Sequence, residues 1–84
     1  MSTDDTLAQT YIKRFFVSTI DRDSSSLLGP DRYSETLVWE WDRATRERGS
    51  IVYQGGTSQG SLFEHFAVVK RIHETGTPQE VEPA

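Results

Sequence analysis

The sequence predicts an α+β fold in which a three-stranded antiparallel sheet carries one C-terminal helix across its apolar face, in the order β-β-β-α. Three segments predict this fold. Residues 10–20 have a strand-forming composition, residues 33–42 alternate between apolar and polar side chains, and residues 61–76 carry a helical apolar stripe between two caps. The chain has 84 residues, which suits a single domain.

Two polar segments bound the predicted domain, which we place at residues 6–76. Residues 1–5 are polar, and we expect them to form a flexible N-terminal tail. Residues 77–84 hold two prolines, two acids and one isolated valine, so we expect a disordered acidic C-terminal tail.

The first predicted strand, at residues 10–20, is rich in β-branched and aromatic residues. Its apolar side chains occupy both faces of a strand: Tyr11, Phe15 and Val17 share one, and Ile12, Phe16 and Ile20 share the other. A strand of this kind is central in a sheet or covered on its second side. Apolar residues at helical spacing over residues 7–16 leave a helix as the alternative.

The connection that follows, residues 21–32, is rich in Ser, Asp, Gly and Pro, which predicts a loop. Leu27 and Leu28 are the exceptions, and we expect them to hold this loop against the core.

Residues 33–42 form the clearest predicted strand. One face holds Tyr33, Glu35, Leu37, Trp39 and Trp41, and the other holds Ser34, Thr36, Val38, Glu40 and Asp42. We expect the helix to cover the first, apolar face. A charged turn at residues 43–49 leads to a short strand at residues 50–54, and the two strands are close enough in sequence to form a hairpin.

The last predicted element is a helix. Ser58 or Ser61 can cap its N-terminus, with Glu64 at the capping-box distance from Ser61, and Gly76 suits its C-terminal stop. Its apolar stripe consists of Leu62, Phe66, Val69 and Ile72, with Phe63 and Val68 at the edges. The competing prediction is a fourth strand at residues 66–72, since several of these residues are β-branched.

Composition excludes several functional classes. The chain has no cysteine, which removes disulfides, thiolate metal ligands and cysteine nucleophiles. His65 and His73 are eight residues apart on the predicted helix, too far to share one metal ion, so we expect no metal and no cofactor. The longest apolar runs are too short for a signal peptide or a membrane span, and the expected location is the cytoplasm.

Charge is divided unevenly along the chain. Thirteen acids and nine bases give a net charge of −4. Five of the acids lie in end segments that contain no base: Asp4, Asp5, Glu74, Glu80 and Glu82. The body is therefore close to neutral, which argues against an acidic mimic of DNA and against a strongly basic nucleic-acid binder.

Two groups of residues are candidates for chemistry. His65 falls within the apolar arc of the predicted helix and could act as a general base, but a buried structural histidine is the favoured interpretation, and no nucleophile is marked. Trp41 could be an exposed aromatic platform, whereas Trp39 fits the core under the helix.

Two further segments could bind anions. Arg43, Arg46 and Arg48 could bind phosphate or carboxylate, although a solvated charged turn explains them as well. The glycine-rich residues 55–60 lead into the predicted helix but lack the ending of a phosphate-binding loop, which favours a simple connection.

One stretch resembles a known pattern. Residues 35–39 read ETLVW, and Glu64-His65 and Val68-Val69 follow about thirty residues later. This resembles short uncharacterised phage and bacterial proteins in which an ETMVF-like strand precedes a helix with a Gly-His step. The sequence departs from that pattern at Glu64, where glycine is usual. The resemblance implies a small α+β protein without an assigned activity.

We therefore expect a non-enzymatic protein-interaction module that self-associates as a homodimer or binds another protein. Surplus apolar surface in a small domain motivates this hypothesis, with Phe16, Ile20 and Val68 as interface candidates. The alternative is a ligand- or nucleic-acid-binding domain, with catalysis left open. It would use His65, Trp41 and the turn from Arg43 to Arg48, and it requires those residues to converge on one concavity.

Overall fold

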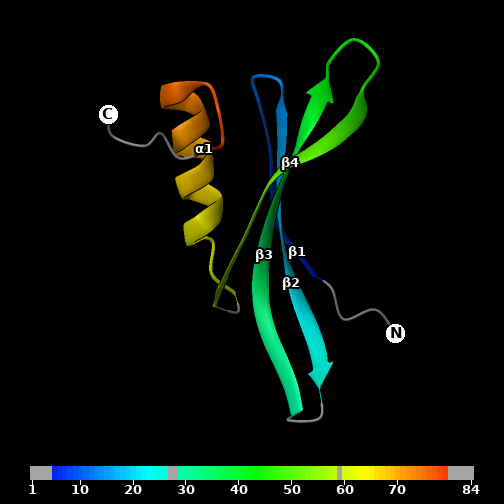
Figure 1. The fold of residues 1–84 in the computed structure, drawn as a ribbon, viewed down its shortest axis with the longest axis vertical. Coiled ribbons are helices and arrows are strands. Elements are labelled where there is room, and N and C mark those ends of the chain that lie inside the picture. Colours follow the sequence, from blue (N-terminus) through cyan, green and yellow to red (C-terminus); the bar gives the residue numbers. More distant parts are fainter. Residues whose placement is uncertain (1–4, 27–28, 59, 80–84) are drawn as a thin grey trace.

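The computed structural model describes residues 5–26, 29–58 and 60–79. These residues form four strands, β1 (Asp5–Ile12), β2 (Phe15–Ser26), β3 (Gly29–Asp42) and β4 (Glu47–Ser58), followed by one helix, α1 (Phe63–Thr75). The strands make one antiparallel sheet in the order β1-β2-β3-β4 (Figure 1). The α+β class is confirmed, whereas the predicted number of strands was one too few.

The extra strand comes from residues 10–20, which are not one strand but the two halves of a hairpin. Ile12 pairs with Phe15, and Lys13 and Arg14 make the turn between them. Lys13 adopts a positive φ of 53°, a conformation that glycine or asparagine usually supplies. The helical alternative for residues 7–16 is wrong, because these residues lie in β1 and at the start of β2.

The turn also changes which side chains share a face. It puts Ile12, Phe15 and Val17 on one face and leaves Tyr11 and Phe16 on the other. The predicted grouping of Tyr11 with Phe15 was therefore wrong. The prediction that an element apolar on both faces lies inside the sheet is confirmed, because β2 has β1 on one side and β3 on the other.

The predicted loop at residues 21–32 belongs instead to two long paired strands. The β2–β3 pairing runs from Phe15 opposite Glu40 to Ser26 opposite Gly29. The expected role of Leu27 and Leu28 lies outside the described residues. The predicted strand at residues 33–42 lies within β3 and pairs with β4, which confirms the second hairpin. β4 is longer than predicted and includes Gly55 and Gly56.

The helix is confirmed, and the alternative strand at residues 66–72 is wrong. Gly76 ends the helix in the left-handed conformation, as predicted, and its N–H donates to the carbonyl of Ile72. Ser58 lies in β4, so the cap predicted there is wrong. Leu62 occupies the N-cap position, and Ser61, one residue earlier, accepts a hydrogen bond from the Phe63 N–H at 3.2 Å. Glu64 does not complete a capping box: its carboxylate accepts a hydrogen bond from Tyr53 on β4 instead. Burial and this contact raise the pKa of Tyr53.

Contacts with the domain continue past the predicted boundary at Gly76. Pro78 is buried, and its carbonyl accepts a hydrogen bond from Arg71 Nη1 at 2.8 Å. The side-chain amide of Gln79 donates to the carbonyl of Val52 on β4. The rest of the predicted C-terminal tail, residues 80–84, lies outside the described residues.

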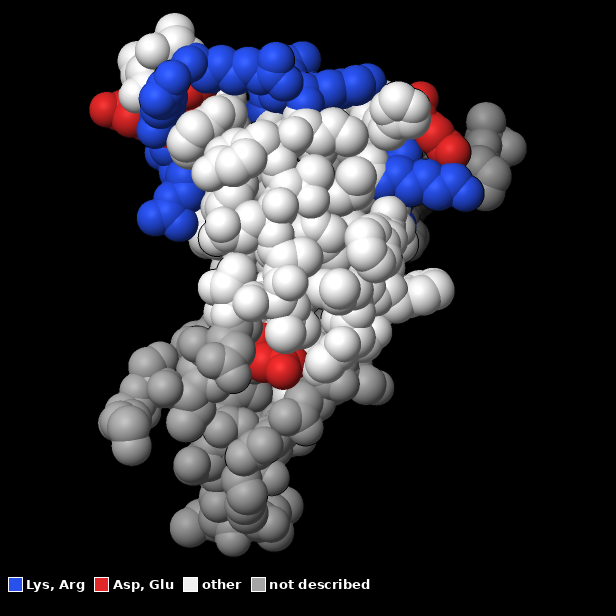
Figure 2. All heavy atoms as spheres, turned by 180° about the vertical axis from the view of Figure 1, so that it is seen from behind, with Lys and Arg blue, Asp and Glu red and all other residues white. Residues whose placement is uncertain are grey.

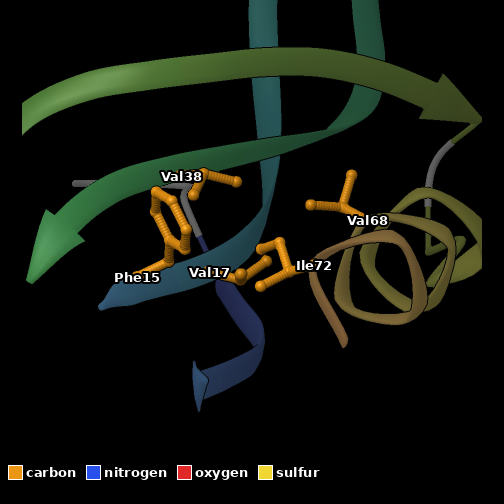
Figure 3. Packing of buried hydrophobic residues seen from close by; sticks show 5 residues of the cluster. All are labelled: Phe15, Val17, Val38, Val68 and Ile72. Carbon is orange, nitrogen blue, oxygen red and sulfur yellow. The ribbon is translucent and has the colours of Figure 1, made fainter. Parts of the chain in front are cut away.

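The core lies between the helix and one face of the sheet. Phe15, Val17 and Val38 face Val68 and Ile72 of α1 (Figure 3). The helix lies along one side of the sheet, and no described helix lies on the other (Figure 1). No helix in the described ranges is long and apolar enough to cross a membrane.

The helix covers the face of the sheet opposite to the predicted one. On β3 it covers the face of Ser34, Thr36 and Val38, and these three side chains are buried. The apolar row with Leu37, Trp39 and Trp41 lies on the other face. The prediction that Trp39 lies under the helix is therefore wrong.

The apolar stripe of the helix is also rotated from its predicted position. Its buried residues are His65, Val68 and Ile72, while Phe63 and Phe66 are 75% and 63% exposed. Small residues on the covered face explain the difference, because they let the helix approach the sheet closely. At Gly55, for example, an added Cβ would lie 2.9 Å from Glu64 Oε1.

Candidate functional site: the open face and basic end of the sheet

The face of the sheet opposite the helix, which we call the open face, carries a group of four aromatic rings. The Phe16 ring centre lies 4.7 Å from that of Tyr11, 5.6 Å from that of Trp39 and 6.0 Å from that of Trp41. Tyr11 and Trp41 are themselves 4.9 Å apart. The sheet positions this group because β1, β2 and β3 place the four residues side by side in register. Phe16, at its centre, is only 5% exposed.

Aliphatic side chains extend the open face beyond these rings. Ile51 opposes Trp39 across the β3–β4 pair and is 55% exposed, nearly as much as Tyr11 at 57%. Leu37 and Ile20 lie further along the same face and are half-buried. The apolar surface is therefore densest at the end of the open face that carries the four rings and Ile51. Further along, the polar residues Gln9, Ser18 and Gln54 share the row of Leu37.

Two charged residues, Arg48 and Glu35, lie in opposite halves of the open face. The Arg48 guanidinium lies 5.1 Å from the centre of the Trp39 ring, in a cation–π contact. Glu35 lies on the same face, two residues before Leu37 on β3 and farther from the rings. Its carboxylate accepts a hydrogen bond from Gln54 Nε2 at 3.2 Å. Arg48 is exposed, whereas Glu35 is only 6% exposed and is held within the sheet.

One end of the sheet is strongly basic. Figure 2 shows Lys and Arg gathered at the end of the molecule where the β1–β2 and β3–β4 turns lie. An open hollow of about 770 Å³ lies between these turns. Its lining consists of Lys13, Arg14, Glu40, Trp41, Asp42, Arg43, Thr45, Glu47, Arg48 and Gly49.

Hydrogen bonds join the two turns that form this hollow. The Trp41 N–H donates to the carbonyl of Arg14 at 2.7 Å, and Arg43 Nε donates to the carbonyl of Lys13 at 3.0 Å. Asp42 Oδ1 accepts from the N–H groups of Ala44 and Thr45, so this carboxylate is used within the β3–β4 turn.

His65 lies in a different place, buried between the helix and the sheet. Its Nε2 is 2.8 Å from the Thr10 hydroxyl, and its Nδ1 is 2.9 Å from the Thr19 hydroxyl. The Thr19 hydroxyl lies 2.6 Å from that of Thr36, which continues the chain of hydrogen bonds. Burial lowers the pKa of His65 and favours the neutral ring. A neutral imidazole suits this chain, since one nitrogen donates while the other accepts.

The predicted candidates therefore do not converge on one concavity. Trp41, Arg43 and Arg48 line the hollow, but Arg46 does not, and His65 lies on the opposite face of the sheet. The alternative site built on all five residues is wrong because of this separation. In the described part of the chain, no group of three or more His, Cys, Asp and Glu side chains could hold a metal ion.

Of the three interface candidates, Phe16 and Ile20 lie on the open face, but Val68 does not. Val68 is fully buried in the core and Phe16 is only 5% exposed beneath its neighbouring rings, which removes both as candidates and leaves the half-buried Ile20. Sequence reasoning missed Tyr11 as an exposed member of this face. The alternation in residues 33–42 was the available signal, because the strand partners of Trp39 and Trp41 must share their face.

Comparison of the chain with protein families, curated proteins and solved structures finds no match. The resemblance to short phage and bacterial proteins therefore stays a prediction.

Proposed function

We propose that this domain is a non-enzymatic interaction module that self-associates by packing its open face against the open face of a second copy. The observation that carries the proposal is the position of the helix. It covers the face with the smaller side chains and leaves Trp39, Trp41 and Ile51 uncovered. Aromatic residues of this kind are enriched in protein interfaces and depleted on inert surfaces.

Two features favour a second copy of the chain as the partner. Sheets pack well face to face, with their side chains interleaved. In addition, a two-fold axis relating the copies packs the ring group of one copy against that of the other, so the two apolar ends cover each other.

Pairing through the β4 edge is less favourable than face-to-face packing. The side-chain amide of Gln79 donates a hydrogen bond to the carbonyl of Val52, which lies on that edge strand. An extra strand would have to displace this contact before it could add to the sheet there.

The size of the domain gives a reason for association. The core between helix and sheet contains five buried apolar side chains with a few half-buried neighbours. Small domains with a core of this size gain from burying a second apolar surface in an oligomer.

Absolute mass in solution, measured by size-exclusion chromatography with light scattering over a concentration series, tests the proposal. We expect a mass near twice the 9.6 kDa chain mass at high concentration. Ile51→Lys puts a charge within the proposed interface in both copies, and we expect it to weaken dimerisation at least about a hundredfold. Because Ile51 is 55% exposed, this change leaves the core intact.

Phe66→Lys is the matched control. Phe66 is an exposed aromatic residue on the helix, on the other side of the sheet, and its replacement should leave the dimer unchanged. A mass of one chain at all concentrations would contradict the proposal. So would a dimer that Phe66→Lys disrupts and Ile51→Lys does not.

A further inference from the structure

The basic end of the sheet has a surplus of positive charge that the charge of the whole chain conceals. Five bases come together in the two turns and at the start of β4: Lys13, Arg14, Arg43, Arg46 and Arg48. None of the five forms an ion pair with a described residue. Their contacts are with carbonyl groups or with the Trp39 ring. Cations that outnumber the acids beside them attract a polyanion.

The acids around the hollow do not neutralise this end. Glu40, Asp42 and Glu47 line it beside four bases, and Arg46 adds a fifth base in the same turn. The Asp42 carboxylate accepts hydrogen bonds from two backbone N–H groups of that turn. The local charge is therefore positive, whereas the whole chain carries −4.

An aromatic platform adjoins these cations. Trp41 lines the hollow, and its ring lies 4.9 Å from that of Tyr11, which is 57% exposed at the edge of the open face. Cations beside the exposed Tyr11 ring and the half-buried Trp41 ring match the requirements of single-stranded nucleic acid. Its phosphates pair with Lys and Arg, and its unpaired bases stack on aromatic side chains.

We propose that the hollow between the β1–β2 and β3–β4 turns binds single-stranded nucleic acid. Arg14, Arg43 and Arg48 contact phosphates, and one base stacks at Trp41 and Tyr11. A duplex is disfavoured because its bases are already stacked on each other and cannot reach these rings. This site goes beyond self-association, since it lies at the end of the sheet and adds Arg14 and Arg43. It shares Trp41 and Tyr11 with the open face, so the oligomer and a second copy compete for these two rings.

Fluorescence anisotropy of a labelled thymidine oligomer of about 12 nucleotides tests the proposal, a length within the range of single-strand binding sites. We expect the logarithm of the affinity to fall with the logarithm of salt concentration with a slope of about −2, which corresponds to about three phosphate contacts. Arg14→Gln and Arg43→Gln should each weaken binding about fivefold at 0.1 M salt and make the slope shallower by about 0.7.

Lys70→Gln is the matched control for charge. It also removes one exposed positive charge, but from the helix and outside the hollow, so it should leave the affinity within twofold of the original. If Lys70→Gln weakens binding as much as Arg14→Gln does, the attraction is due to net charge alone and the proposed site is wrong.

Stacking needs a separate readout. Trp41→Ala should weaken binding about tenfold, and Trp41→Phe should restore most of the affinity because it keeps an aromatic ring. Since Trp41→Ala could disturb the contact with Phe16, we add a second measurement. In a Trp39→Phe variant Trp41 is the remaining tryptophan, and its emission should be quenched when the oligomer binds.

Three competitors complete the test. Inorganic pyrophosphate, a polyphosphate of similar length and a poly-glutamate peptide all supply negative charge without bases. The proposal requires the oligomer to bind at least tenfold more tightly than each of them. Equal binding of polyphosphate would reduce the site to an anion site, and equal binding of poly-glutamate would indicate a protein partner. Either result, or absence of oligomer binding at low salt, would overturn the proposal.

Discussion

Replacing Thr19 with valine tests the chain of hydrogen bonds that joins the helix to the sheet. The Thr19 side chain is fully buried, and its hydroxyl lies between His65 Nδ1, at 2.9 Å, and the Thr36 hydroxyl, at 2.6 Å. Valine has nearly the same shape, so Thr19→Val removes both hydrogen bonds without opening a cavity.

The expected cost follows from these two contacts. Each hydrogen bond contributes about 1 kcal/mol, and a buried group left without a partner costs about 1 kcal/mol or more in addition. Burial of the methyl group that replaces the hydroxyl stabilises the variant by about 1 kcal/mol, which offsets part of this cost. We therefore expect Thr19→Val to lower the free energy of unfolding by about 2 kcal/mol.

Urea denaturation followed by tryptophan fluorescence measures this change. With a slope of about 1 kcal/mol per molar urea, the midpoint should fall by about 2 M while the slope stays the same. Both proteins are compared at one concentration, because self-association would shift the midpoint. Thr10→Val is the matched control: its hydroxyl bonds His65 Nε2 at 2.8 Å in a half-buried place, where water can replace it. It should cost less than about 1 kcal/mol. If Thr19→Val is neutral, or costs no more than Thr10→Val, the reasoning is wrong.

Three further predictions concern pH, the β4–helix contact and the helix end. Burial lowers the pKa of His65, so the unfolded chain binds a proton at this residue before the folded chain does as pH falls below about 6.5. The free energy of unfolding should therefore drop between pH 7.5 and 5. In urea titrations, His65→Gln should remove this part of the drop. Gly55→Ala should cost about 1 kcal/mol, since the new Cβ lies 2.9 Å from Glu64 Oε1, and a double-mutant cycle with Glu64→Ala should abolish the cost. Gly76→Ala should lower the thermal midpoint at a cost of about 1 kcal/mol, because φ is +81° there, whereas Ala67→Gly would destabilise the helix itself by a similar amount.

Local patterns predicted the elements better than their boundaries. The alternation over residues 33–42 and the glycine stop of the helix were sufficient for β3 and α1. The turn at Lys13 and Arg14 could not be found in this way, because neither residue is a typical turn former and the backbone there is held by pairing on both sides. The polar composition of residues 21–32 hid two paired strands, since backbone hydrogen bonds do not depend on side-chain polarity.

The face that receives the helix could not be predicted from apolarity alone. The helix covers Thr36 and Val38 rather than Trp39, since smaller side chains allow closer packing and His65 finds hydroxyl partners there. This choice decides the candidate site, because it leaves the aromatic row exposed. The hollow was missed in part for a similar reason: Lys13 was assigned to a strand interior, far from the arginines of the β3–β4 turn.

The order of the strands has a consequence for how the chain acquires its structure. Each strand pairs with its neighbour in sequence, so the hairpins can form one after another without closing long loops, which favours rapid folding. The helix follows the four described strands in the sequence and is synthesised after them, yet it reaches back 55 residues to contact Thr10 through His65. Until it docks, Phe15 and Val17 are exposed on one face, while Tyr11 and Ile51 are exposed on the other. A nascent or truncated chain without α1 is therefore a sheet with two apolar faces, and aggregation competes with folding until the helix arrives.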